Sequence, residues 1–159
     1  MYKYLSPQDA ILLLKGDCLI QMQGIGNSTV DLICCDLPYG TTKNKWDVVI
    51  DADKLWHHYN RILKPNGTIV LFGQGIFTSK MILSNPSMYR YSLVYEKTTA
   101  TGHLNAKKRP MSCHEDIMIF SKTPRHIYKP QKTTGHARKV STANHKRNSK
   151  DTTNYNSFG

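Results

Sequence analysis

Several absences narrow the classes of function open to this chain of 159 residues. No apolar run approaches the roughly 20 residues that a membrane-spanning helix needs, and residues 1–8 carry no signal-peptide pattern. The four cysteines form no C-x-x-C pair, and the seven histidines show no zinc-ligand spacing such as H-x-x-x-H. Cys34 and Cys35 fall on a predicted buried strand. We therefore expect a cytoplasmic protein without membrane contact, with reduced core cysteines and without a metal.

Acidic residues are scarce, because 11 Asp and Glu oppose 22 Lys and Arg and leave a formal net charge of +11. The imbalance is concentrated in residues 123–159, where eight basic residues face the single acid Asp151, so this segment carries +7 of the total. The same segment has hardly any aliphatic side chains and cannot order itself by burying apolar area. Such a basic surface is typical of a nucleic-acid-binding protein. A solvated basic tail without a specific partner is the alternative.

Residues 1–122 show the alternating pattern of an α/β domain. Their hydrophobic periodicity predicts strands at 10–16, 29–35, 68–72, 89–96 and 116–120, and helices at 18–23, 51–64 and 77–83. Asp17 is expected to cap the first helix, and the Pro-Asn-Gly sequence at 65–67 to stop the second and turn the chain. This order of elements indicates a mixed, mostly parallel sheet. Residues 123–159 would form a separate, loop-like contact segment.

The second predicted strand is apolar and ends in the turn Asp36-Leu37-Pro38-Tyr39-Gly40. Ligands of open α/β sheets bind beyond the carboxyl ends of strands, where this turn lies. The Asp36 carboxylate and the Leu37 carbonyl can accept hydrogen bonds from both N–H groups of an exocyclic amino group, which localises the nitrogen lone pair. Pro38 fixes φ and removes a competing N–H, and Tyr39 offers a ring on which an extruded base can stack. A purely structural turn is the alternative interpretation.

Further motifs surround this turn in a definite order. They are Lys15-Gly16-Asp17-Cys18-Leu19, Asn44-Lys45-Trp46-Asp47, Leu63-Lys64-Pro65-Asn66-Gly67, Leu71-Phe72-Gly73, Ala100-Thr101-Gly102-His103-Leu104-Asn105-Ala106-Lys107-Lys108 and His114-Glu115-Asp116-Ile117. Together with the turn, they resemble the DNA amino-methyltransferases, which use S-adenosylmethionine to methylate adenine-N6 or cytosine-N4. The resemblance covers residues 12–131. Leucine in place of the first proline of D-P-P-Y is typical of the phage or prophage branch of that family.

The resemblance implies a Rossmann-like, S-adenosylmethionine-dependent methyltransferase fold and a role for several residues. The tetrapeptide Asp36-Leu37-Pro38-Tyr39 would be catalytic, holding the target amino group and stacking the base. Asp17 and Cys18, together with Asp36, would contact the cofactor. Aspartate rather than serine at the first place of the tetrapeptide favours adenine over cytosine as the target.

DNA is the partner that the resemblance implies, in phage DNA methylation or a restriction–modification system. The residues expected to contact DNA are Lys97, Lys107, Lys108, Arg109, His114, Arg125, Lys129, Lys132, Arg138 and Lys139. Lys97, His114 and Glu115 fall where the family lines the side of the target base. For His114 and Glu115, a strand-edge pair that only supports the fold is the alternative.

One motif of the family does not occur in these residues. The cofactor motif Asp-Pro-Phe-x-Gly-x-Gly should follow the recognition region, and no such sequence is present. We therefore expect an incomplete methyltransferase fold. The chain would then be a truncated or frame-shifted product, an enzyme half whose cofactor site is completed by a second chain or a homodimer partner, or a module that binds DNA or a partner without turnover. A methyltransferase acting on RNA or protein amides is the weaker alternative, because those enzymes more often carry asparagine in place of Asp36.

Overall fold

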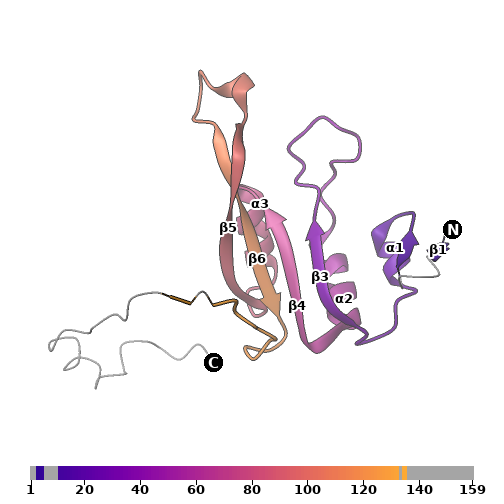
Figure 1. Cartoon of the computed structure of the whole chain (residues 1–159). Helices are drawn as coiled ribbons and strands as arrows, with labels where there is room; N and C mark the ends of the chain where they lie inside the picture. The colour runs from indigo at the N-terminus through magenta and orange to yellow at the C-terminus, as the bar shows by residue number, and fades with distance from the viewer. Residues whose placement is uncertain (1–2, 6–10, 133, 136–159) are drawn as a thin grey trace. The chain divides into compact units, whose positions relative to one another are not determined.

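The computed structural model describes residues 3–5, 11–132 and 134–135, and Figure 1 shows the elements that they form. The chain separates into two units, residues 1–127 and 128–159. The described helices and strands all lie in the first unit. In chain order they are β1 Lys3–Leu5, β2 Leu12–Leu14, α1 Cys18–Met22, β3 Val30–Asp36, α2 Ala52–Ile62, β4 Leu63–Gly73, α3 Ile76–Ser84, β5 Tyr89–Thr101, the 3-10 helix His103–Asn105 and β6 Ser112–Ser121. The predicted α/β class is confirmed, and within the described ranges no helix is long and apolar enough to cross a membrane.

Aspartate side chains begin the first two helices. Asp17 Oδ1 accepts hydrogen bonds from the backbone N–H groups of Leu19 at 2.8 Å and Ile20 at 3.3 Å. Asp51 Oδ1 accepts one from the backbone N–H of Lys54 at 3.0 Å. These caps satisfy N–H groups that have no partner inside the helix. The cap predicted at Asp17 is therefore confirmed, and it fixes the start of α1 at Cys18.

Four strands form one sheet in the order β3-β4-β6-β5, while β1 and β2 pair separately as an antiparallel ribbon. β3 and β4 are parallel, whereas β6 runs antiparallel to both of its neighbours. The mixed sheet is confirmed, although the described strands contain less parallel pairing than the sequence pattern suggested. The reason is that β5 and β6 are joined as a hairpin through residues 102–111, and β6 then inserts between β4 and β5.

The Pro-Asn-Gly sequence at 65–67 behaves differently from its prediction as a turn. It lies within β4, where Leu63 pairs with Val30 but Thr68 pairs with Leu32, so the pairing is interrupted by a bulge. A Cβ atom on Gly67 would lie 2.7 Å from Leu63 Cδ1 and 3.0 Å from the Asp31 carbonyl oxygen. The glycine thus allows the two strands to approach at the bulge, and the chain turns immediately after α2 instead.

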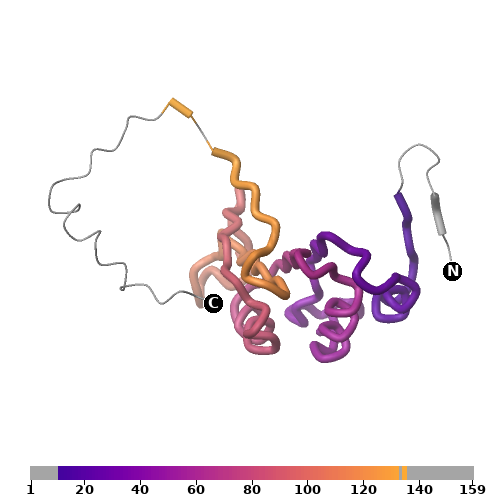
Figure 2. Tube along the Cα trace, turned by 90° about the horizontal axis from the view of Figure 1, so that it is seen from below, coloured from indigo at the N-terminus to yellow at the C-terminus, as the bar shows by residue number. Residues whose placement is uncertain are grey.

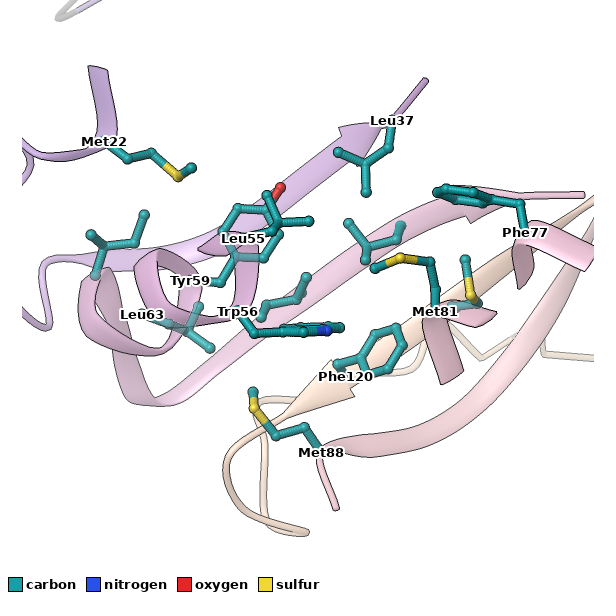
Figure 3. Packing of buried hydrophobic residues seen from close by; sticks show 14 residues of the cluster. Met22, Leu37, Leu55, Trp56, Tyr59, Leu63, Phe77, Met81, Met88 and Phe120 are labelled. Carbon is teal, nitrogen blue, oxygen red and sulfur yellow. The ribbon is translucent and has the colours of Figure 1, made fainter. Parts of the chain in front are cut away.

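The hydrophobic core lies on one face of the sheet, under α2 and α3, which occupy the same side in both views (Figures 1 and 2). Trp56 of α2 packs against Phe120 of β6, with ring centroids 5.0 Å apart, and its Nε1 donates a hydrogen bond to Ser84 Oγ at 2.8 Å. Figure 3 shows these rings beside Leu55 and Met81. The fully buried members from the sheet are Leu63, Ile69, Leu71, Met118 and Phe120.

The opposite face of the sheet is apolar, and no helix of the described ranges covers it. The strand register puts Cys34, Val70, Ile119 and Tyr91 in one row of this face, and Asp36, Phe72, Ile117 and Leu93 in the next. We call these eight residues the open face. Leu93 is 52% exposed, and Leu32 beside the first row is 56% exposed. Sheets that contain parallel strands normally bury both faces. The apolar side chains of the open face are therefore of the kind that is usually buried in an interface.

The prediction of buried core cysteines is wrong. Cys34 is exposed on the open face, Cys35 is only half-buried on the helix side, and Cys18 and Cys113 are exposed. The reason is that β3 is an edge strand of the described sheet with helices on one face alone. All four cysteines carry free thiols.

Two leucines on opposite faces of the sheet provide a test of this one-sided core. Leu71 points toward α2 and α3 and is fully buried, so Leu71→Ala should lower the free energy of unfolding by about 2–5 kcal/mol. Leu93→Ala, on the open face, should change it by less than about 0.5 kcal/mol. Urea denaturation of the purified chain followed by circular dichroism measures both. Equal losses would contradict the assignment of the two faces.

Candidate active site

β3 ends at Asp36, and the turn that follows carries the sequence-predicted tetrapeptide beyond the carboxyl end of the strand. The Asp36 carboxylate is exposed, and within the described residues it makes no ion pair. Its Oδ1 accepts a hydrogen bond from the Tyr39 hydroxyl at 2.8 Å. Leu37 is buried in the core between them, so the tetrapeptide is anchored by one apolar side chain while its carboxylate faces outward.

Tyr39 connects this carboxylate to the core. Its ring is half-buried and lies against Phe77 of α3, with centroids 4.8 Å apart and a 36° angle between the planes. Burial first, and the hydrogen bond to Asp36 second, raise the pKa of the Tyr39 phenol well above its usual range. The phenol therefore stays protonated at any physiological pH and acts as a hydrogen-bond donor to Asp36. Only part of the ring remains available for stacking.

A cavity of about 1040 Å³ opens beside Tyr39. Its walls come from the loop after the tetrapeptide, the start of α3 and the β5–β6 hairpin, and include Phe77, Lys80, Arg109 and His114. This volume exceeds that of a single nucleobase and lies in the range of small-molecule sites. Aromatic and basic side chains thus share one cavity next to the exposed carboxylate. Arg109 and His114, two residues predicted to contact DNA, are brought together here.

Asp47 holds the loop that forms one wall of this cavity. Its carboxylate accepts backbone N–H hydrogen bonds from Gly40 at 2.8 Å, Thr41 at 2.9 Å and Thr42 at 2.6 Å. These bonds, those of Thr42 foremost, lower the pKa of the Asp47 carboxyl below its usual value. Gly40 has a φ of +68°, and a Cβ atom there would lie 2.8 Å from Val49 Cγ2. The loop is thereby fixed at the residue that directly follows Tyr39.

From the sequence, Asp47 is recognised only as the last residue of the motif Asn44-Lys45-Trp46-Asp47, and no role is predicted for it. Three successive N–H groups around a glycine with positive φ form an anion-binding concavity, and here a carboxylate of the same loop fills it. An aspartate seven residues beyond the glycine of the turn was the available signal. It was not sufficient, because many exposed loops contain such an acid without forming these bonds.

Two of the three residues predicted to contact the cofactor, Asp17 and Cys18, lie at the start of α1, whereas the third, Asp36, ends β3. Asp17 uses Oδ1 to cap the helix, and Cys18 is exposed. The thiol of Cys35 has a raised pKa, chiefly because of burial, although a hydrogen bond with Tyr59 opposes the shift. Cys18 and Asp36 both add smaller electrostatic contributions to the same rise. Cys18 therefore lies in the neighbourhood of Cys35 and Tyr59.

The basic residues predicted to contact DNA occupy different environments. Lys107, Lys108 and Arg109 are exposed in the β5–β6 connection. Lys97 is half-buried and forms an ion pair with Glu115, so its charge is largely neutralised. Arg125 is exposed in the first unit, Lys129 and Lys132 are exposed in residues 128–132, and Arg138 and Lys139 lie outside the described residues.

The Asp47 carboxylate should stabilise the fold in a pH-dependent way. Because folding lowers its pKa, the stabilisation is present above the ordinary carboxyl pKa of about 3.9 and is lost as the pH falls through the lower folded value. Asp47→Asn should lower the melting temperature at neutral pH, and the difference from wild type should shrink in acid. Thermal denaturation across this pH range tests both points. A difference that does not vary with pH would contradict the role of the carboxylate charge.

Comparisons with known proteins agree with this geometry. The sequence model of the N6_N4_Mtase family, described as DNA methylase, matches residues 30–158. The fold is similar to that of PvuII DNA methyltransferase, named cytosine-N4-specific, with a TM-score of 0.53 and 14% identity over 70% of this chain and 48% of that one. It is also similar to the M1.HpyAVI–SAM complex, with a TM-score of 0.50 and 16% identity over 77% of this chain and 58% of that one.

A third similar structure is TTHA0409 from Thermus thermophilus, assigned as a DNA modification methylase, with a TM-score of 0.51 and 16% identity over 73% of this chain and 54% of that one. The chain thus spans about half the length of the solved proteins that it matches. At these identities the structures establish a shared fold, while the sequence model covers most of the chain. The chain belongs to the N6/N4 DNA methyltransferase family.

Proposed function

We propose that this chain is the catalytic part of a DNA adenine-N6 methyltransferase that acts on an extruded base. The observation that carries the proposal is the exposed Asp36 carboxylate at the end of β3, hydrogen-bonded to Tyr39 beside a cavity of about 1040 Å³. Asp36 accepts a hydrogen bond from the target amino group, and the Leu37 carbonyl accepts the second. The amino nitrogen then approaches tetrahedral geometry, and its lone pair becomes available for methyl transfer. Asp36 also attracts the proton that leaves.

The cavity next to Tyr39 suits a flipped base. Phe77 supports one side of the Tyr39 ring, which leaves the remainder to stack on the base. Lys80, Arg109 and His114 around the cavity can neutralise the phosphates that flank the base. Pro38, which does not line the cavity, restricts the backbone between Leu37 and Tyr39. Extruding a base costs a few kcal/mol, so these stacking and phosphate contacts are needed to offset that cost.

S-adenosylmethionine, when bound, supplies an activated methyl group on a sulfonium sulfur. Asp17 and Cys18 are the residues that would hold its adenine end, with Asp36 nearby. Their chemistry fits, because Asp17 is exposed and uses a single carboxylate oxygen for its cap, and because Cys18 lies near Cys35, the residue before Asp36. The aspartate in the tetrapeptide is our reason for proposing adenine. The fold itself is shared with a protein named as specific for cytosine-N4, so the base must be measured.

Loss of the Asp36 carboxylate should abolish methyl transfer. Asp36→Asn keeps the shape but cannot accept a hydrogen bond at both side-chain positions, and we expect the rate to fall about a hundredfold or more. Asp31→Asn is the matched control, since Asp31 lies on the same strand in an exposed ion pair with Lys64 and should leave the rate unchanged. The measurement is transfer of radiolabelled methyl groups from S-adenosylmethionine to duplex DNA.

Hydrolysis of the methylated DNA identifies the modified base in the same experiment. N6-methyladenine is the expected product. N4-methylcytosine would retain the methyltransferase but overturn the proposed base. Measurable methyl transfer that is equal in Asp36→Asn and wild type would overturn the proposed chemistry itself.

Residues 123–159 are proposed to contact the phosphate backbone of DNA, as a segment distinct from the methyltransferase-like residues 1–122. The support is its charge, +7 from eight basic residues and one acid, and the exposure of the described basic residues Arg125, Lys129 and Lys132. We propose that this activity takes place in the cytoplasm, in a restriction–modification system or in phage DNA methylation.

Neutralising this segment should weaken the salt dependence of DNA binding. Replacing Arg125, Lys129 and Lys132 together with glutamine should reduce the slope of log K against log salt by about 0.9 for each phosphate that the variant no longer neutralises. Lys64→Gln is the control. Lys64 lies at the start of β4, whereas Asp36 is next to Phe72 near the end of that strand, and Lys64 forms an ion pair with Asp31. Fluorescence anisotropy of labelled duplex DNA across a salt series measures the slopes. An unchanged slope in the triple variant would contradict this role.

A further stretch of polypeptide is proposed to complete the cofactor site, supplied by a second chain or a homodimer partner. The support is the open face and the outer edge of β3, which pairs with no strand among the described residues. If no such partner acts, the chain is better described as a DNA-binding module without turnover. Calorimetry separates the two, since intact DNA affinity without S-adenosylmethionine binding supports the module.

A further inference from the structure

We infer that Trp46 stacks on a nucleobase of DNA other than the target base. The inference rests on the proposed DNA function and adds a contact residue outside the tetrapeptide. Trp46 is 72% exposed, which is unusual for the largest apolar side chain. The other tryptophan of the chain, Trp56, is buried and its Nε1 is bonded to Ser84. The chain therefore has a core that can bury a tryptophan, and Trp46 is exposed because of its position in the loop.

The backbone presents this ring in a fixed position. The Asn44 carbonyl accepts a hydrogen bond from the Asp47 N–H at 3.0 Å, so Lys45 and Trp46 occupy the two central places of a tight turn. Asp47, which closes the turn, also holds Gly40, Thr41 and Thr42 through its carboxylate. The turn with Trp46 is thus tied to the residue after Tyr39. The backbone that carries the ring therefore loses little conformational freedom on binding.

The residues around Trp46 favour a partner that is a polyanion and carries aromatic bases. Lys43 and Lys45 precede it in the same loop, and both are exposed. Basic side chains beside an exposed aromatic ring suit nucleic acid, because the cations neutralise phosphates while the ring stacks on a base. Acidic residues are absent between Gly40 and Asp47, and the Asp47 carboxylate is engaged by the backbone. No acid between these two residues therefore opposes the approach of a phosphate.

The base that Trp46 contacts differs from the one beside Tyr39. The loop contributes Thr41, Thr42, Val49 and Ile50 to the wall of the cavity, but Trp46 does not line it. Its ring therefore lies outside the cavity, on the same loop. When a base leaves the duplex, the neighbouring bases lose a stacking partner, and an aromatic ring outside the pocket can replace it. Trp46 is placed to provide that contact.

Acrylamide quenching of tryptophan fluorescence tests the contact directly in the full chain. Trp46 should be quenched strongly in the free protein, while buried Trp56 should not, and Trp46→Phe supplies the Trp56 background. Mixed-sequence duplex DNA at low salt, without any methyl donor, should protect Trp46 from acrylamide. Unchanged quenching in the DNA complex would overturn the inference. Protection that depends on protein concentration without DNA would assign the ring to a protein interface and overturn it as well.

Binding measurements distinguish stacking from charge. Trp46→Ala should weaken duplex binding about tenfold with an unchanged salt slope, whereas Trp46→Phe should retain most of the affinity. Lys45→Gln, one residue away, should instead reduce the slope by about 0.9. Equal affinity of Trp46→Ala and wild type would overturn the inference. DNA binding with an unprotected Trp46 would leave the proposed methyltransferase function standing, while absence of any DNA binding would overturn both.

Discussion

The three hydrogen bonds from the backbone of Gly40, Thr41 and Thr42 to the Asp47 carboxylate are the constraint on which the candidate site depends. A strand end alone would leave the tetrapeptide at the start of a long polar loop, with many conformations open to it. The carboxylate closes that loop over a few residues and so fixes the chain on the far side of Tyr39. Leu37 fixes the near side by its burial in the core. Asp36 and Tyr39 are held between these two anchors, and the turn that carries Trp46 is held by the second.

The fold around this site is one-sided. The helices α2 and α3 bury one face of the four-stranded sheet, and the rows that contain Val70, Ile119 and Phe72 lie on the other face (Figure 1). Asp36 belongs to one of these rows, next to Phe72 on β4. Polypeptide that covered the open face would therefore also approach the Asp36 carboxylate. In the proposed function, completion of the sheet and completion of the cofactor site are the same structural event.

Local signals in the sequence predicted the elements that are determined locally. Asp17 and the apolar stripe of α2 identify helix starts and buried faces, because capping and helical periodicity depend on a few neighbouring residues. The tetrapeptide Asp36-Leu37-Pro38-Tyr39 is predicted as a candidate site for the same reason, since its acceptor groups and its aromatic ring come from adjacent residues. The family resemblance inferred from these motifs is confirmed by the family match over residues 30–158.

What the sequence could not predict depends on long-range pairing. The insertion of β6 between β4 and β5 follows from register over many residues, and no local pattern specifies it. The same holds for the exposure of Cys34, which is decided by the absence of a helix over the open face within the described residues. Asp47 is the instructive case. Its three bonds exist only because Gly40 adopts a positive φ and turns successive N–H groups toward one point.

The hydrogen bond between Tyr39 and Asp36 determines how the carboxylate can be used. Because burial keeps the phenol protonated, it occupies Oδ1 as a donor, and no other hydrogen bond to the Asp36 carboxylate is found within the described ranges. Oδ2 then remains for an incoming N–H group, with its direction set by the tyrosine. The carboxylate need not be rearranged when a base arrives, so little orientation is lost at that step. In the proposed reaction, Tyr39 accordingly contributes twice, by positioning the acceptor and by supporting the base beside it.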